Sequence, residues 1–323
     1  MLRLLLIERP QMITLFIFIS AFHLSISSEG ECANALKEAR ALDVPRTIST
    51  THGDIENAEF WDDNDELLQQ ARKEWGKEHV GLYRFDEEFI SEFLDPKVKE
   101  ALEQKSTARM KSVVRTTEKE GVFKIKMFNE KFVDSILDEL SFQEKSKIPM
   151  RRPNGMNRYG CILNELGFEE FLKGLSDRLL KPIAQILFSR RVSVQDLTTE
   201  YGFVVQYHPA SDVNLAEHAD ASAITANICL LPSKEDAPLF FKNVREIGET
   251  THDVEPVKVA LDIPGEVVFH LGQHIHGVSN VTSSRSNMVV WLMGDYGYVR
   301  VAPYDEHEIL ANQLSFEKNY GWN

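Results

Sequence analysis

The sequence contains little cysteine. Only Cys32, Cys161 and Cys229 occur among its 323 residues. Three thiols cannot build a framework of paired disulfides, because one of them must stay unpaired or bond outside the chain. Cys229 lies in an apolar run, where a thiol is most simply a small buried side chain. The fold is therefore expected to depend on its hydrophobic core and not on cross-links.

Long apolar runs, positive charge and internal repeats are also lacking. Beyond the N-terminus no apolar run reaches the length of about 18 residues that a membrane-spanning helix needs. The formal net charge is −14, which argues against a general nucleic-acid-binding protein because phosphate binding requires a basic face. A hydrophobic content of 43% and a charged content of 27% are those of an ordinary globular protein. We therefore expect no internal membrane span and no nucleic-acid partner.

The N-terminus has the pattern of a targeting segment. Arg3 and Arg9 precede an apolar stretch at 12–26, and small serines follow it. This order is typical of a secretory signal peptide that is cleaved near Ser27. The sequence thus predicts a signal peptide at 1–28 and a protein in the endoplasmic reticulum lumen or outside the cell. An uncleaved signal anchor, which would hold the protein at the membrane, is the alternative.

Helix-forming patterns dominate the region that follows, at 29–118. Its first part, 29–58, is polar and is expected to have little regular structure. Helices are predicted at 65–75 and 86–94, where apolar residues recur at helical spacing between capping and breaking residues. The charged stretch at 105–121 is interpreted as a connector. We expect a helical N-terminal region.

The rest of the chain changes from helices to short strands. A second domain is predicted at 119–302, and the tail at 303–323 is uninformative. This domain opens with an alternating strand at 122–128 and two amphipathic helices, at 129–140 and 168–179. Six β-runs are then predicted at 198–208, 223–231, 238–244, 256–261, 265–271 and 286–294. Many short strands after a run of helices indicate an α+β fold with a jelly-roll core and helices packed on it.

The sharpest constellation of polar residues begins at His218-Ala219-Asp220. Residues i and i+2 of a strand point to one face, so His218 and Asp220 can bind one metal ion together. Two histidines and one carboxylate with open positions are typical of non-haem Fe(II) oxygenases. The third ligand is one of His270, His274 and His276, which share one strand parity. His276 is favoured because a glycine follows it and leaves room for a ligand, whereas the other two are expected to lie behind the site or on the surface.

Three further residues are candidates for binding a small molecule beside the metal. Arg285 opens the next predicted strand, where its planar guanidinium can pair with a carboxylate in bidentate fashion. Tyr207 and Asn227 lie on strands that flank the His218-Ala219-Asp220 segment, and both can donate hydrogen bonds into one cavity. A role as ordinary polar strand residues is equally compatible with the pattern.

The residues at these positions resemble a known family. Four stretches carry the resemblance: 152–160 (Arg-Pro-Asn-Gly-Met-Asn-Arg-Tyr-Gly), 203–207, 218–228, and 276–277 together with 285–292. They are similar to the 2-oxoglutarate- and iron(II)-dependent dioxygenases, in the branch that contains the prolyl and lysyl hydroxylases. The resemblance covers roughly 120–295 and says little about 29–118.

This resemblance implies a double-stranded β-helix core and a specific chemistry. The implied site residues are His218, Asp220 and His276 for iron, and Arg285, Tyr207 and Asn227 for 2-oxoglutarate. The implied cofactors are Fe(II), 2-oxoglutarate, dioxygen and ascorbate, with no catalytic residue beyond the metal site. The implied reaction hydroxylates an unactivated C–H bond on a lysyl or prolyl side chain of a protein or peptide, with succinate and carbon dioxide as coproducts.

Two alternatives to this enzyme stay open at the level of the sequence. In the first alternative the protein has this fold but is a catalytically inactive metal-holding or protein-interaction module. The presence of all three ligands together with Arg285 argues against it. A zinc hydrolase is less compatible, because the one acidic neighbour, Glu217, points away from His218 by strand parity. The basic residues Arg151, Arg152 and Arg158 near the predicted entrance hint at an acidic partner, whereas each taken singly is more simply a charge of a solvated loop. The oligomeric state is not predicted.

Overall fold

The computed structural model describes most of the chain. The described residues are 28–50, 53–233, 238–244, 254–295, 313–314 and 316–322. The predicted signal peptide, apart from Ser28, and most of the predicted tail at 303–323 lie outside them. Among the helices that the structure describes, none combines the length and the apolar character needed to cross a bilayer.

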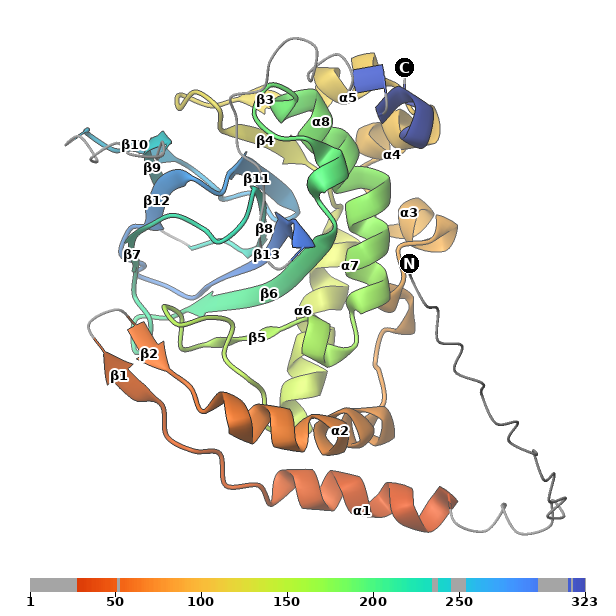
Figure 1. Ribbon diagram of the computed structural model, residues 1–323, viewed down its shortest axis with the longest axis vertical. Coiled ribbons are helices and arrows are strands. Elements are labelled where there is room, and N and C mark those ends of the chain that lie inside the picture. Colours follow the sequence, from red (N-terminus) through yellow and green to blue (C-terminus); the bar gives the residue numbers. More distant parts are fainter. Residues whose placement is uncertain are drawn as a thin grey trace, which may run out of the picture.

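The described residues alternate between helices and strands as the sequence pattern indicates (Figure 1). The α-helices are α1 (Ser28–Arg40), α2 (Ala58–Trp75), α3 (Glu87–Phe93), α4 (Pro96–Glu103), α5 (Thr107–Val113), α6 (Glu130–Lys145), α7 (Glu169–Leu175) and α8 (Lys181–Phe188). The strands are β1 (Ile48–Thr50), β2 (Gly53–Ile55), β3 (Arg115–Thr116), β4 (Phe123–Lys126), β5 (Gly160–Ile162), β6 (Thr199–Tyr207), β7 (Leu215–His218), β8 (Ile224–Leu231), β9 (Leu239–Val244), β10 (Val257–Val259), β11 (Glu266–Leu271), β12 (His274–Val278) and β13 (Arg285–Met293).

Two antiparallel sheets form the core of the fold. The larger has the order β3-β4-β11-β8-β13-β6-β5, and the smaller has the order β10-β9-β12-β7. From β6 onward the chain passes from one sheet to the other, with β6, β8, β11 and β13 in the larger and β7, β9, β10 and β12 in the smaller. This order defines a double-stranded β-helix. The predicted α+β fold with a jelly-roll core is therefore confirmed.

The larger sheet is covered on both faces, which explains why its strands are apolar along their whole length. On β8, Ile224, Ala226 and Ile228 pack against the helices, whereas Cys229 belongs to the core between the two sheets. All residues of this strand except the last are buried. In Figure 1 helices α6, α7 and α8 lie along the side of the larger sheet that faces away from the smaller one. The space between the sheets is left for the site.

The helices largely follow the local signals in the sequence. Asn129 caps α6, and its side chain accepts a hydrogen bond from the Phe132 amide at 3.0 Å. The helix predicted at 168–179 extends further, because a π-helical turn joins α7 to α8. Pro182 lies in the first turn of α8, directly after the π-helical turn, and it donates no amide hydrogen bond back to that turn.

Two expectations for the N-terminal region were wrong. The segment predicted to be weakly structured contains α1, whose buried Ala39 packs into a small core with Leu68 and Ala71 of α2. The segment interpreted as a connector contains α5 and β3, and Met110 of α5 is fully buried in the main core. In both cases burial against a neighbouring element stabilises a segment whose own sequence is mostly polar.

Candidate functional site

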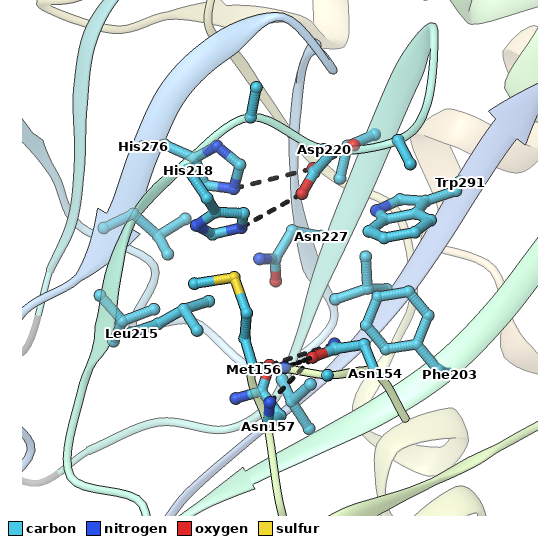
Figure 2. A pocket seen from close by; sticks show the side chains of 18 of the residues that line it. Asn154, Met156, Asn157, Phe203, Leu215, His218, Asp220, Asn227, His276 and Trp291 are labelled. Carbon is cyan, nitrogen blue, oxygen red and sulfur yellow. Dashed lines mark hydrogen bonds and ion pairs between the residues drawn. The ribbon is translucent and has the colours of Figure 1, made fainter. Parts of the chain in front are cut away.

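His218, Asp220 and His276 converge at the open end of the space between the sheets. His218 ends β7 and His276 lies directly opposite it on β12, with ring centroids 4.4 Å apart. Asp220 follows β7, and its amide donates to the Gly272 carbonyl at 2.8 Å. The ligand atoms of the three side chains lie within 4.8 Å of one another. Figure 2 shows both imidazoles directed toward the carboxylate.

Backbone carbonyl groups fix the orientation of both imidazoles. The Nδ1 of His218 lies 2.9 Å from the Ala216 carbonyl oxygen, and the Nδ1 of His276 lies 2.9 Å from that of His274. Protonation at Nδ1 leaves the Nε2 lone pairs directed to the site, as metal binding requires. The two Nε2 atoms lie 3.3 Å and 3.7 Å from the Asp220 carboxylate oxygens.

The Asp220 carboxylate is buried but kept ionised by its surroundings. Burial alone would raise its pKa, but the charge of His276 and a hydrogen bond from His218 hold the pKa well below its usual range. Burial outweighs the influence of Asp220 at His276 and lowers the pKa of that imidazole. At His218 burial is outweighed by the hydrogen bond and charge of Asp220, which raise the pKa. The site thus offers an anionic oxygen between two imidazole nitrogens.

Residues other than the two histidine ligands also support this carboxylate. The Thr225 hydroxyl donates to Oδ2 of Asp220 at 2.5 Å and also contacts the Ser222 hydroxyl at 2.8 Å. His270 is fully buried, with its Nε2 3.9 Å from the same oxygen. Thr225 shares its strand face with Asn227, and this two-residue spacing is the signal that could have identified it.

The choice among the three downstream histidines is decided by a turn. Gly272 and Gln273 separate β11 from β12, so His270 lies in the larger sheet while His274 and His276 lie in the smaller one. The three histidines therefore do not lie on one strand, although their even spacing had suggested a common strand face. Both His270 and His274 are buried, and the surface location considered for them is wrong. Only His276 stands opposite His218.

The donor set fits a metal ion of the iron type. Two imidazole nitrogens and one carboxylate oxygen converge from one side, and the opposite side faces a cavity of about 190 Å³. This arrangement suits non-haem Fe(II), which needs open coordination positions. His218, Asp220 and His276 would hold it, with Thr225 orienting the carboxylate.

Arg285 lies on the inner face of the same barrel at the start of β13. It is 2% exposed and stands opposite Tyr207 of β6. Burial lowers the pKa of its guanidinium. Its Nε donates to the Asn287 side-chain oxygen at 2.8 Å, and the Asn287 amide donates to the Asn227 oxygen at 2.8 Å. The structure therefore connects Arg285 to Asn227 through a residue that the sequence reasoning missed.

Tyr207 is joined to the 152–160 stretch by a similar link. The Asn157 amide donates to its hydroxyl at 3.2 Å, and burial raises the pKa of Tyr207 to about 12. The phenol is therefore protonated at neutral pH and retains its own proton for donation. Tyr207 and Asn227 both line the cavity, as their strand positions indicated. Asn157 carried part of the family resemblance, and Asn287 stands two residues after Arg285 on the same strand face.

The basic residues near the site are already paired within the chain. Arg151 lies 3.3 Å from Glu56 and 3.6 Å from Glu165, and Arg158 lies 3.1 Å from Asp212. The buried Arg152 donates to backbone carbonyl groups of its own loop. These intrachain contacts account for the positions of the three cations, and the suggestion that they attract an acidic partner stays a prediction.

Replacing Thr225 by valine should weaken metal binding while leaving the fold intact. The substitution keeps the β-branched shape but removes the hydroxyl that donates to Asp220. Loss of such a supporting hydrogen bond lowers metal affinity by roughly 10- to 100-fold. The measurement is a titration of the purified protein with Fe(II) under anaerobic conditions. Ser286→Ala removes a buried hydroxyl from β13 and is the control, for which we expect unchanged affinity. Equal affinities in all three proteins would contradict a supporting role for Thr225.

Comparisons with known proteins give the same assignment as the motifs. Residues 71–192 match the OGFOD2-like domain. The zebrafish (Danio rerio) "2-oxoglutarate and iron-dependent oxygenase domain-containing protein 2" is 32% identical over 66% of this chain and 62% of its own length. The Arabidopsis thaliana "2-oxoglutarate and iron-dependent oxygenase domain-containing protein ICU11" is 32% identical over 66% of this chain and 54% of its own length. The Homo sapiens "2-oxoglutarate and iron-dependent oxygenase domain-containing protein 2" is 33% identical over 54% of this chain and 50% of its own length. The chain thus spans about half to three-fifths of these relatives.

Solved structures with limited likeness include a Pseudomonas putida prolyl-4-hydroxylase and the carbocyclase SnoK. They are 17% and 16% identical, with TM-scores of 0.36 and 0.41. They cover 53% and 59% of this chain and are themselves covered to 86% and 85%. The assignment of the fold rests on the strand order described above.

The matched segment also corrects the extent of the resemblance. It runs from residue 71, inside α2, to residue 192, whereas the sequence motifs indicated roughly 120–295, so it begins earlier and ends before the metal-ligand positions. Helices α3, α4 and α5 therefore lie within the segment that matches the family model. The predicted resemblance itself is confirmed: residues 71–192 match the OGFOD2-like domain, and the chain is similar to the 2-oxoglutarate and iron-dependent oxygenase domain-containing proteins.

Proposed function

We propose that this protein is a 2-oxoglutarate- and Fe(II)-dependent dioxygenase that hydroxylates an unactivated C–H bond on a protein side chain, lysyl or prolyl. The observation that carries the proposal is the joint placement of three metal ligands and a buried cation. His218, Asp220 and His276 face the cavity between the sheets, and Arg285 lies on the inner face of the same barrel. A purely structural metal site would have no use for Arg285.

Each residue of the site has a defined task in this reaction. His218, Asp220 and His276 hold the iron, and the Arg285 guanidinium pairs with the far carboxylate of 2-oxoglutarate. A carboxylate there offsets the charge of a guanidinium that is 2% exposed. Asn227 and Tyr207 line the cavity and orient the cosubstrate through hydrogen bonds.

The apolar walls of the cavity have the complementary task of excluding water. Phe203, Val205, Leu239 and Val289 line it from both sheets. When bound, Fe(II) supplies the oxidation, in which dioxygen and 2-oxoglutarate yield the hydroxylated product, succinate and carbon dioxide. The proposal includes ascorbate as the reductant that keeps the iron in its Fe(II) state. The predicted signal peptide supports action in the secretory pathway.

An anaerobic titration of the full chain with Fe(II) and then 2-oxoglutarate tests this proposal. Chelation of iron by the keto acid gives a visible charge-transfer band, which we expect for the wild-type protein. His218→Ala should give no band. Arg285→Ala should need on the order of 100-fold more 2-oxoglutarate, because truncating one member of a buried charge pair costs about 2–5 kcal/mol.

A surface cation provides the control for Arg285. Arg84 pairs with Glu170 at 3.1 Å in an exposed ion pair, and Arg84→Ala should bind 2-oxoglutarate as the wild type does. A folded wild-type protein without the band would refute the oxygenase. The inactive metal-holding or protein-interaction module would then be the better reading of the site.

A further inference from the structure

The cavity between the sheets is poor in charge. Among the described residues that line it, Asp220 supplies the one carboxylate, and neither lysine nor arginine is present. That carboxylate is already engaged by His218, His276 and Thr225. The other walls are mainly apolar, and they include Phe203 and Trp291, whose rings meet edge to face at 5.0 Å. A cationic substrate group would find no free partner on these walls.

Met156 is the exposed apolar residue at the mouth of this cavity. It is 40% exposed, yet it lines the cavity together with the metal ligands. In Figure 2 its thioether lies beside Asn227 and points toward His218, between Leu215 and the Phe203–Trp291 wall. An unbranched, polarisable methionine adapts to apolar partners of different shape, which suits a binding surface.

Hydrogen bonds within the loop hold the backbone around Met156 in place. Asn154 accepts hydrogen bonds through its side-chain oxygen from the amides of Met156 at 2.9 Å and Asn157 at 2.8 Å. The buried Arg152 donates to the carbonyl groups of Asn154 and Gly155, both at 3.0 Å. The turn is therefore closed on itself, and the position of Met156 does not depend on a bound ligand.

The same loop is anchored to the barrel at three points. The Tyr201 hydroxyl donates to the Pro153 carbonyl at 2.9 Å. Asn157 donates to the Tyr207 hydroxyl, and Arg158 binds Asp212 through its amide and guanidinium. These contacts fix the backbone of Met156 relative to the barrel that carries the metal ligands, while its side chain can adapt to a bound group. Because its backbone is anchored and the residue is 40% exposed, Met156 is well placed to contact a bound substrate.

We propose that Met156 is a specificity-determining residue and that the site accepts an uncharged, mainly apolar side chain, packed between Met156 and Trp291. This inference rests on the proposed function and narrows its substrate. A lysyl ammonium would lose its hydration at the cavity without gaining a carboxylate partner, and this loss opposes its binding. A prolyl or other aliphatic side chain would instead bury apolar surface against the thioether and the indole.

Peptide binding in the absence of turnover tests this inference. Full-chain protein is loaded with Mn(II) and 2-oxoglutarate under anaerobic conditions, and fluorescence anisotropy follows labelled peptide pools that differ only in the central residue. Pools centred on proline or leucine should bind at least about tenfold more tightly than the pool centred on lysine. Equal or tighter binding of the lysine pool overturns the inference, and so does the absence of binding by every pool.

Glutamate substitutions at two similarly exposed residues of the loop test whether Met156 determines the preference for apolar peptides. Met156→Glu places a carboxylate at the cavity mouth, so binding of the lysine pool should improve about tenfold. Tyr159→Glu adds the same charge to the same loop, at a residue that is 48% exposed and outside the cavity lining, and should leave the preference unchanged. Met156→Leu should keep the wild-type preference. Equal effects of the two glutamates would overturn the role of Met156.

The proposed function has a separate readout. The charge-transfer band of wild-type protein with Fe(II) and 2-oxoglutarate reports on the cosubstrate site and does not involve a peptide. A missing band refutes the oxygenase itself. A present band combined with preferred binding of the lysine pool refutes only the substrate class inferred from Met156.

Discussion

Asp220→Ala should abolish metal binding, a larger loss than that expected for Thr225→Val. Its carboxylate supplies the anionic ligand between His218 and His276, at 3.3 Å and 3.7 Å from their Nε2 atoms. Two neutral imidazoles remain in the variant, and they offer no charge to balance a divalent ion. A metal present at about 100 times its dissociation constant stabilises the wild-type fold by about 2.7 kcal/mol. The variant should gain none of this stabilisation, which urea unfolding with and without metal measures.

Asp212→Ala is the matched control for this experiment. Asp212 is 6% exposed, against 7% for Asp220. Asp212 precedes strand β7, whereas Asp220 follows it. Asp212 binds Arg158 and belongs to no cluster of three or more metal-ligand side chains among the described residues. Its loss should lower the free energy of unfolding equally with and without metal. A metal-dependent gain in the Asp220 variant equal to that of the wild type would contradict the assigned ligand.

The candidate site could be predicted from the sequence where its residues follow strand periodicity. His218 and Asp220 were recognisable by their spacing, and Arg285 by its place at the start of a strand. The structure brings these residues to one barrel. Thr225 and Asn287 were missed although each stands two positions from a predicted site residue on the same strand face. The role of Asn287 depends on a hydrogen bond to Asn227 on the neighbouring strand, and that of Thr225 on one to Asp220 in the segment before β8. Strand periodicity alone predicts neither contact.

The fold was predictable for buried elements and less so for marginal ones. The strand patterns of β8 and β13 were clear because both faces of these strands are buried. The short β7 has two exposed residues among four, so its sequence carries no alternation, and its pairing with β12 defines it. Helix α1 is stabilised by packing against α2 rather than by its own composition.

The shared core also connects the N-terminal helices to the barrel domain. Phe89 of α3 is 1% exposed and contacts the rings of Phe128, Phe132 and Phe171 at 6.5, 5.8 and 5.2 Å. These partners lie beyond the boundary predicted near residue 118. A single hydrophobic cluster therefore contains residues from both predicted regions. The consequence is that the two should unfold together.

Phe89→Ala should destabilise the whole protein by about 3–5 kcal/mol, the range for removing a large aromatic side chain from a packed core. Because Phe89 joins α3 to the helices that cover the larger sheet, the loss should appear in one cooperative transition. Chemical unfolding followed by far-ultraviolet circular dichroism and by tryptophan fluorescence measures this. The two signals report on helices and on the surroundings of the tryptophans, one of which, Trp291, lies in the barrel.

Phe142→Ala serves as the comparison. Phe142 is a half-buried ring on α6 that contacts Trp75 at 5.2 Å and lies outside the main core. Phe142 buries less apolar surface than Phe89. Its substitution should therefore lower the free energy of unfolding clearly less than Phe89→Ala does. Equal losses in the two variants would contradict the central position of Phe89. Separate transitions for helices and barrel would show that the N-terminal helices fold on their own, and the metal site would then survive the loss of Phe89.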